Sequence, residues 1–172
     1  MIHKAGERLR LRAAIVLCWL GLASCAPSPQ VLRLGDGTEV FFLSNTKVQP
    51  ANSYPRVREI KIDGEAFIRA PAAELPLVIR TRLLTLTVLD RSALRVTARS
   101  SETGEEADVL YGRVEAKKAY PSRQNEPDTL LAGEIVMVNE TIDLQEKETT
   151  DIVSLRSWSE NLIASVERKS AR

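Results

Sequence analysis

Short runs of β-forming residues, separated by turn residues, are the feature that most constrains the fold of this chain. From residue 31 onward, segments rich in Val, Ile, Leu and Thr alternate with clusters of Gly, Pro, Asp and Asn. Such spacing is typical of β-strands joined by turns. Because no helical pattern separates the runs, a parallel α/β fold is excluded. A sandwich, a barrel or a solenoid remains open, and we predict a mainly β chain: an antiparallel β-sandwich or β-solenoid-like domain over residues 31–146.

Alternating apolar and polar residues define the individual runs. The predicted strands cover 31–34, 38–43, 57–62, 65–70, 76–81, 83–89, 93–98, 109–118, 130–139 and 140–146, and the predicted polar loops cover 99–108 and 120–129. Asp36-Gly37 and Asp63-Gly64 each lie between two runs, so both dipeptides predict a tight hairpin turn.

The C-terminal segment, 147–172, has a different periodicity. Its apolar residues recur at spacings of three and four: Leu155, Trp158, Leu162 and Val166. This spacing indicates an amphipathic helix, with Asp151 or Thr150 as its N-cap. We expect the apolar face to pack on the β domain; the alternative is that it docks a partner.

The N-terminal segment, 1–24, reads as a lipoprotein signal peptide. A basic head precedes 12 apolar or small residues, 13–24, which are fewer than the roughly 20 that span a bilayer. Leu22-Ala23-Ser24-Cys25 has the form of a bacterial lipobox. The interpretations left open are a plain secretory signal with an incidental cysteine and a retained membrane anchor.

Cys25 is accordingly the predicted site of lipid attachment and the first residue of the mature chain. Two or three acyl chains suffice for stable membrane attachment, and residues 25–30 form a short, Pro-containing linker. Since Ala26 rather than Asp follows the cysteine, the expected location is the periplasmic face of the outer membrane, with the inner membrane as the alternative.

The residues left after processing restrict the chemistry. Residues 25–172 contain 20 Lys and Arg against 22 Asp and Glu, so no basic field favours nucleic acid. His3 and Cys18 lie in the predicted signal peptide, which leaves no histidine and no free thiol. Zinc sites and His-dependent triads are thereby excluded, and no phosphate-binding loop is present. We expect no catalytic residues, no metal and no cofactor, and therefore not an enzyme. The alternative left open is a hydrolase that uses a pair of carboxylates, since acidic residues are abundant.

Several motifs resemble the periplasmic domain of the FecR family of anti-sigma regulators. They fall in the family's order between residues 31 and 158: Asp36-Gly37-Thr38, Tyr54-Pro55-Arg56, Gly64-Glu65-Ala66-Phe67, Gly112 within the run 109–116, Gly133-Glu134, and Trp158. From the residues themselves, these positions have structural roles. The glycines suit turns, Phe67 and Leu110 suit the core, and Glu65 and Glu134 suit bonds to turn amides.

The resemblance implies a β-rich periplasmic domain that binds another protein in envelope signalling or assembly. The family's sigma-binding domain and transmembrane helix have no counterpart in this sequence, so the resemblance does not carry over anti-sigma activity. The expected partners are the membrane, through the lipid on Cys25, and a periplasmic or outer-membrane protein. The alternative is a structural envelope lipoprotein that binds glycan or peptidoglycan.

Overall fold

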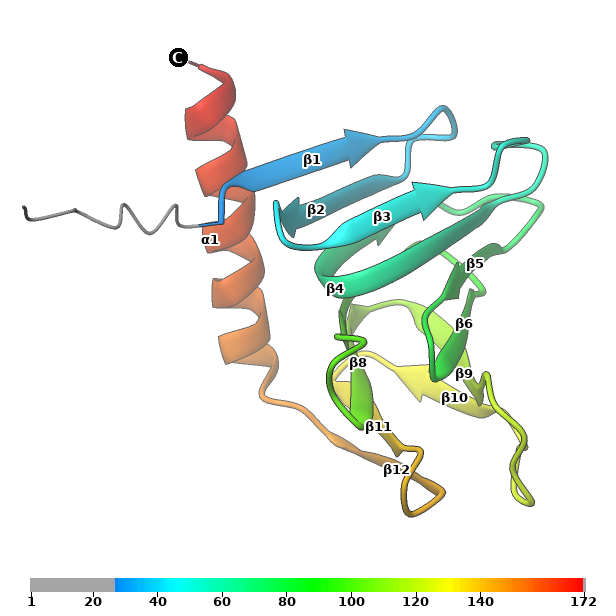
Figure 1. Ribbon diagram of the computed structural model, residues 1–172. Helices are drawn as coiled ribbons and strands as arrows, with labels where there is room; N and C mark the ends of the chain where they lie inside the picture. The colour runs from blue at the N-terminus through cyan, green and yellow to red at the C-terminus, as the bar shows by residue number, and fades with distance from the viewer. Residues whose placement is uncertain (1–26, 172) are drawn as a thin grey trace, which may run out of the picture.

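A computed structural model describes residues 27–171 of the protein. Within that range the chain forms twelve β-strands followed by one α-helix (Figure 1). The predicted signal peptide, 1–24, and the predicted lipid site, Cys25, lie outside the described residues.

The strands form two layers that share one long strand, β4. Sheet A contains, in spatial order, β1 (Pro29–Arg33), β2 (Glu39–Leu43), β4 (Glu59–Ala70), β7 (Ser92–Ala98), β8 (Gly104–Tyr111), β11 (Glu134–Asn139) and β12 (Leu144–Thr149). Sheet B contains β3 (Lys47–Pro50), β4, β5 (Leu77–Arg80), β6 (Leu84–Val88), β9 (Arg113–Lys118) and β10 (Asp128–Leu131). Every pairing is antiparallel except that of β4 with β5.

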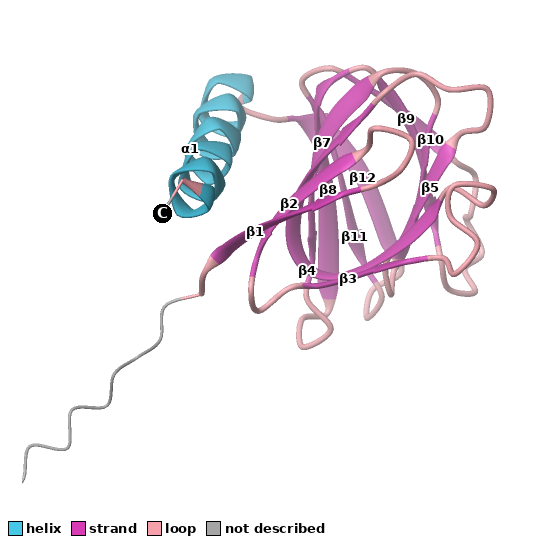
Figure 2. Ribbon diagram, turned by 90° about the horizontal axis from the view of Figure 1, so that it is seen from above, coloured by secondary structure: helices cyan, strands magenta, loops and turns pink. Residues whose placement is uncertain are grey.

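The two layers enclose the main core, and Figure 2 shows from above how the strands surround it. Its fully buried side chains come from both sheets and include Ile60, Ile68, Leu86, Leu94 and Val136. Alternate residues along each strand point inward, as expected for packed β-layers. The prediction of a mainly β fold with a C-terminal helix is confirmed, as a mixed sheet nearly closed into a barrel-like sandwich.

The helix α1 (Ile152–Ser170) covers part of the outer face of sheet A. Asp151 is its N-cap, and the Asp151 carboxylate accepts hydrogen bonds from the backbone N–H groups of Val153 and Ser154. A second core lies beneath the helix, where Trp158 meets Phe67 edge to face with ring centroids 6.3 Å apart. The predicted packing of this helix on its own domain is confirmed.

The predicted hairpin at Asp63-Gly64 is wrong. Both residues lie inside the 12-residue strand β4, where Gly64 has φ +129°. The first half of β4 pairs in sheet B and the second half in sheet A, so Gly64 marks the corner at which the strand passes between layers. A glycine at such a bend permits a backbone conformation closed to other residues.

Two predicted single strands, 109–118 and 130–139, are each divided by such a corner. Gly112, with φ +93°, separates β8 in sheet A from β9 in sheet B. Gly133, with φ +84°, separates β10 in sheet B from β11 in sheet A. In both places the β pattern continues along the sequence while the chain changes layer.

Three further segments differ from the sequence prediction. Residues 104–108, predicted as loop, begin β8. Their carboxylates have hydrogen-bond donors: the Leu83 backbone N–H donates to Glu105, and Arg95 donates to Asp108. Residues 140–143 form a turn rather than the start of a strand. Strand β3 was not predicted at all, because Lys47–Pro50 contains only one strongly apolar residue.

Candidate interaction site

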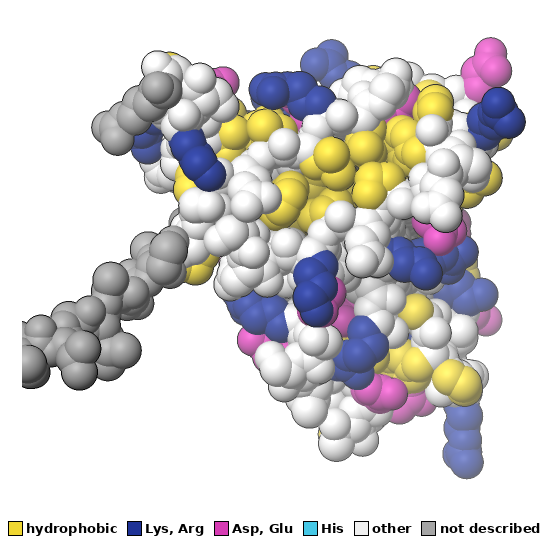
Figure 3. All heavy atoms as spheres, turned by 45° about the horizontal axis from the view of Figure 1, so that its top comes forward, with side chains coloured by type: hydrophobic (Ala, Val, Ile, Leu, Met, Phe, Trp, Pro, Cys, Tyr) yellow, Lys and Arg dark blue, Asp and Glu magenta, His cyan; other side chains and the backbone are white. Residues whose placement is uncertain are grey.

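The edge strands β1 and β3 do not pair with each other among the described residues, and we call this break in the backbone ladder the open seam. β1 pairs only with β2, and β3 pairs only with β4. Five partly buried residues line the open seam and pack on the main core: Leu32, Leu34, Phe42, Val48 and Tyr54. Figure 3, which brings the top of Figure 1 forward, shows hydrophobic side chains gathered in a band across this side of the molecule. Partly buried apolar side chains, rather than a backbone ladder, therefore cover the interior here.

A buried ion pair closes one end of the open seam. Asp36, in the turn between β1 and β2, accepts a hydrogen bond from Arg58 Nε at 2.7 Å, and the two side chains are 11% and 6% exposed. Tyr54 Oη donates to the same carboxylate at 2.6 Å, and Thr38 donates through both its backbone N–H and its hydroxyl. Arg58 also donates to the carbonyl of Leu75. The cluster ties the end of sheet A to the β3–β4 connection.

Electrostatics in this cluster keep Asp36 ionised. Burial alone raises the pKa of Asp36, but the hydrogen bonds from Tyr54, Thr38 and Arg58 outweigh it and hold the pKa below its usual value. Burial, together with the Asp36 carboxylate, raises the pKa of Tyr54. A buried charge paired in this way is costly to separate from its partner.

A threonine hydroxyl closes the other end of the open seam. Thr46, between β2 and β3, donates its hydroxyl to the carbonyl of Glu65 and accepts from the backbone N–H of Glu65, both at 3.0 Å. A Cβ on Gly64 would lie 2.8 Å from Thr46 Cα, so only glycine fits at this corner. The open seam is thus fixed by polar contacts at both ends, and partly buried apolar side chains cover its middle.

At the opposite side of the molecule, side chains close the gap between the edge strands β10 and β12. Gln145 donates to the Asp128 carboxylate at 2.6 Å, and Lys147 donates to the carbonyl of Thr129 at 3.4 Å. We call this the closed seam. No backbone ladder joins β10 to β12 among the described residues, so polar side chains alone bridge these edges.

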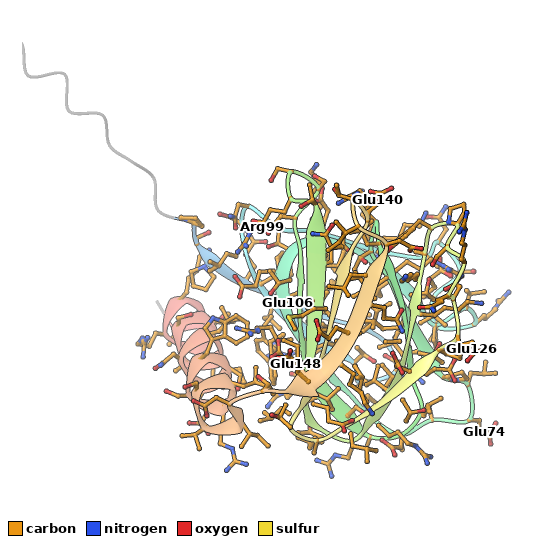
Figure 4. All side chains as sticks on the ribbon, turned by 90° about the horizontal axis from the view of Figure 1, so that it is seen from below. Glu74, Arg99, Glu106, Glu126, Glu140 and Glu148 are labelled. Carbon is orange, nitrogen blue, oxygen red and sulfur yellow. The ribbon has the colours of Figure 1, made fainter. Side chains whose placement is uncertain are left out.

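The outer faces of the two sheets carry different charges. Beyond α1, the outer face of sheet A has acidic side chains on β8 and β12, and Figure 4 shows Glu106 and Glu148 there, beside the helix. On sheet B the exposed residues of β4, β5 and β9 include Lys61, Arg80 and Lys117. A partner that approaches the open seam from sheet B therefore meets cations.

The residues singled out from the sequence occupy five places. Asp36 and Thr38 belong to the buried ion-pair cluster, with Gly37 in the same turn at φ +84°, and Gly64 and Glu65 form the other end of the open seam. Ala66 faces the main core, whereas Phe67 and Trp158 meet beneath α1. Gly112, Gly133 and Glu134 lie at the remaining corners. The motif is therefore spread around the sheet junctions, and about half of it brackets the open seam.

The two acidic residues that follow glycines differ in their partners. Glu134 accepts a hydrogen bond from the Leu131 backbone N–H at 2.8 Å, as predicted. The prediction for Glu65 is wrong, because its carboxylate pairs with Arg99 at 3.0 Å instead of a turn amide. The sequence predictions included neither Arg58 nor Thr46. For Arg58 a signal was present, because an arginine close to the apolar residues that begin a strand indicates a buried ion pair.

Residues 27–171 contain neither a helix that could span a membrane nor a cluster of metal ligands. The single helix in that range is not apolar enough to cross a bilayer. No group of three His, Cys, Asp or Glu residues there is close enough to bind a metal ion.

The likeness of this chain to known proteins is structural. No protein-family model matches the chain, and no curated protein does. Two crystal structures of a proposed anti-sigma factor from Parabacteroides distasonis ATCC 8503 match with TM-scores of 0.67 and 0.66 and 25% sequence identity. In both, the match covers 77% of this chain and 60% of that chain. The likeness supports a coarse relation to anti-sigma proteins of the FecR-like type, and it is consistent with a role in envelope signalling regulation.

Proposed function

We propose that this chain is a lipid-anchored, periplasmic protein-interaction domain that acts in envelope signalling, by binding rather than by catalysis. Its likeness to solved anti-sigma factor structures supports a regulatory role. Because the match spans only 60% of the neighbour's length, that protein's complete activity does not carry over. The lipobox sequence ending at Cys25 supports the anchor, and Ala26 after the cysteine supports the location at the outer membrane.

The observation that carries the proposal is the open seam between β1 and β3. An unpaired sheet edge beside apolar side chains is a site at which proteins add a strand. Burial of Leu32, Phe42 and Val48 by a partner supplies a hydrophobic driving force of about 25 cal/mol for each Å² of apolar surface removed from water. The contacts at both ends of the open seam fix the positions of the edge strands before a partner binds.

Photo-crosslinking in intact cells tests this proposal. A crosslinking amino acid at Gln49, on β3, is expected to give a discrete adduct with one protein. The matched position Glu146, on the distant edge strand β12, is expected to give none. Absence of any adduct at Gln49, or sedimentation of the purified protein with peptidoglycan, would contradict the proposal and favour a structural, glycan-binding lipoprotein.

Mass spectrometry of the protein purified from cells tests the anchor separately. We expect a chain that begins at an acylated Cys25, and a Cys25→Ala variant that is no longer retained in membranes. An unmodified thiol at Cys25 with the N-terminal segment still attached would refute the anchor.

A further inference from the structure

A row of cations lies on the outer face of sheet B and ends at the open seam. The strand registers place five outward-facing residues side by side across β3, β4, β5, β6 and β9: Gln49, Lys61, Arg80, Thr85 and Lys117. We call this the basic row. Lys47 and Arg82 lie beside it, and the surface between them is hollowed by a shallow depression of about 490 Å³.

The charges of the basic row are only partly balanced. Arg80 pairs with Glu59 at 2.8 Å, and Lys47 pairs with Asp63 at 3.6 Å on an exposed surface. Lys61 and Lys117 form no ion pair with any of the described residues. Lys61 and Arg80 lie directly opposite each other, and like charges in that position destabilise a sheet. Arg82 pairs with Glu140 at 2.5 Å. Lys61 and Lys117 are therefore the cations that an anionic partner would complement.

Strand geometry joins the basic row to the open seam. Successive side chains of a β-strand point to opposite faces. A strand added to the free edge of β3 would therefore direct alternate side chains inward, onto Val48 and Phe42, and the others outward, beside Lys47 and Gln49. The first set must be apolar to cover the open seam. The second set lies next to the basic row, where carboxylates are complementary.

We propose that β3 binds a β-strand of a protein partner in which apolar residues alternate with Asp or Glu. This inference rests on the proposed function and specifies the partner's chemistry. The strand adds to β3, covers the open seam with its apolar residues and places its carboxylates beside Lys47 and Gln49, in the row that continues to Lys61 on β4. Lys47 and Pro50 disfavour unselective pairing, because lysine and proline are common protections of edge strands. A lipid headgroup could meet the cations but would not cover the apolar side chains of the open seam.

Synthetic peptides with the full-length acylated protein in detergent micelles test the inference. The probe is a ten-residue peptide of alternating Val and Glu. The controls are alternating Val and Lys, and a Val and Glu peptide of equal composition with the residues in two blocks. We expect binding of the first peptide alone, with slowed amide hydrogen exchange confined to Lys47–Pro50 and the neighbouring β1 edge. Equal binding of the block peptide would overturn the inference.

Charge-reversal variants locate the contact. Lys61→Glu is expected to weaken binding of the Val and Glu peptide at least tenfold and to create binding of the Val and Lys peptide. Arg168→Glu makes the same change of charge at the exposed end of α1 and is expected to have no effect. If both variants weaken binding equally, general electrostatic attraction explains the result and the proposed site is wrong.

The remaining outcomes also decide between occupants. Concentration-dependent dimerisation with exchange protection at β3 would identify a second copy of the chain as the occupant and overturn the inference. The same holds if vesicles containing anionic phospholipid, but not the peptide, protect β3. A crosslinked partner at Gln49 whose yield is unchanged by Lys61→Glu would leave the proposed function standing while refuting the acidic strand.

Discussion

The open seam and the closed seam are both places where an edge of sheet A faces an edge of sheet B, but different contacts cover the gap at each. At the closed seam, Gln145 and Lys147 reach from β12 to β10 and fill the gap with polar contacts. At the open seam, polar contacts are confined to the two ends, and partly buried apolar side chains cover the middle.

This difference shows where the protein's stability and its binding capacity reside. A domain that needed only to be stable would cover the β1 and β3 edges as it covers β10 and β12. The buried ion pair and the Thr46 hydroxyl instead hold the β1–β2 hairpin away from β3 at a fixed distance. Both edges are left without a strand partner on their outer sides among the described residues.

The largest expected effect comes from breaking the buried ion pair. Arg58→Met leaves the Asp36 carboxylate buried without its cation, and removing one partner of such a pair costs about 3–5 kcal/mol. Chemical denaturation would measure this loss in the free energy of unfolding. The double variant Asp36→Asn with Arg58→Met, which has no unpaired charge, is expected to recover part of it. A double variant no more stable than Arg58→Met would show that charge is not the reason.

Alanine substitutions at two corner glycines compare the other end of the open seam with the closed side. Gly64→Ala forces a Cβ against the Thr46 backbone at a positive φ, and we expect a loss of about 3 kcal/mol. Gly133→Ala has the same kind of φ but no heavy atom within 4 Å of the new Cβ, so only about 1–2 kcal/mol is expected. Equal losses in thermal unfolding would mean that Thr46 does not restrict this corner.

The strands themselves were largely predictable from the sequence, because inward and outward residues alternate along most of them. β6 illustrates this, since the predicted run 83–89 contains the whole of Leu84–Val88. The helix was predictable for the same reason, from the three- and four-residue spacing of its buried face. Local periodicity is sufficient to predict a strand or helix where buried and exposed residues alternate regularly along the whole element.

The corners and the open seam were not predictable, because they depend on distant contacts. A glycine inside a strand and a glycine in a hairpin have the same local sequence, and only Thr46, 18 residues earlier, makes Gly64 a corner. Likewise, polar residues 104–108 indicate a loop until Thr81 and Leu83 supply partners for Glu105. Which edge strands remain uncovered is a property of the whole topology.

A smaller effect is expected at the closed seam. Gln145→Ala removes the hydrogen bond to Asp128 and is expected to lower the free energy of unfolding by about 1 kcal/mol. Amide hydrogen exchange in β10 should become faster, because this bond holds the strand against β12. Glu146→Ala, an exposed outward position on the same strand, serves as the control and should change neither quantity measurably. Unchanged exchange in Gln145→Ala would show that β10 is held by β9 alone.

The smallest effect concerns a buried carboxylate and appears as a dependence on pH. Glu105 is 4% exposed; burial raises its pKa, although it accepts hydrogen bonds from Thr81 and the Leu83 backbone N–H. Between the unfolded pKa of 4.5 and the higher folded value, the native state binds more protons than the unfolded state. Glu105 therefore makes stability fall as pH rises through that window.

The change of stability with pH that Asp36 causes has the opposite sign, because its folded pKa is lowered. Its contribution to stability is lost only as pH falls below the unfolded value of 3.8. Glu105→Gln should therefore remove the decline above pH 4.5 and leave the acid-side loss unchanged. Denaturation curves measured from pH 3 to pH 7 in both proteins separate the two groups. If the variant keeps the decline above pH 4.5, another group causes it, and Glu105 is already ionised in the folded protein throughout that range.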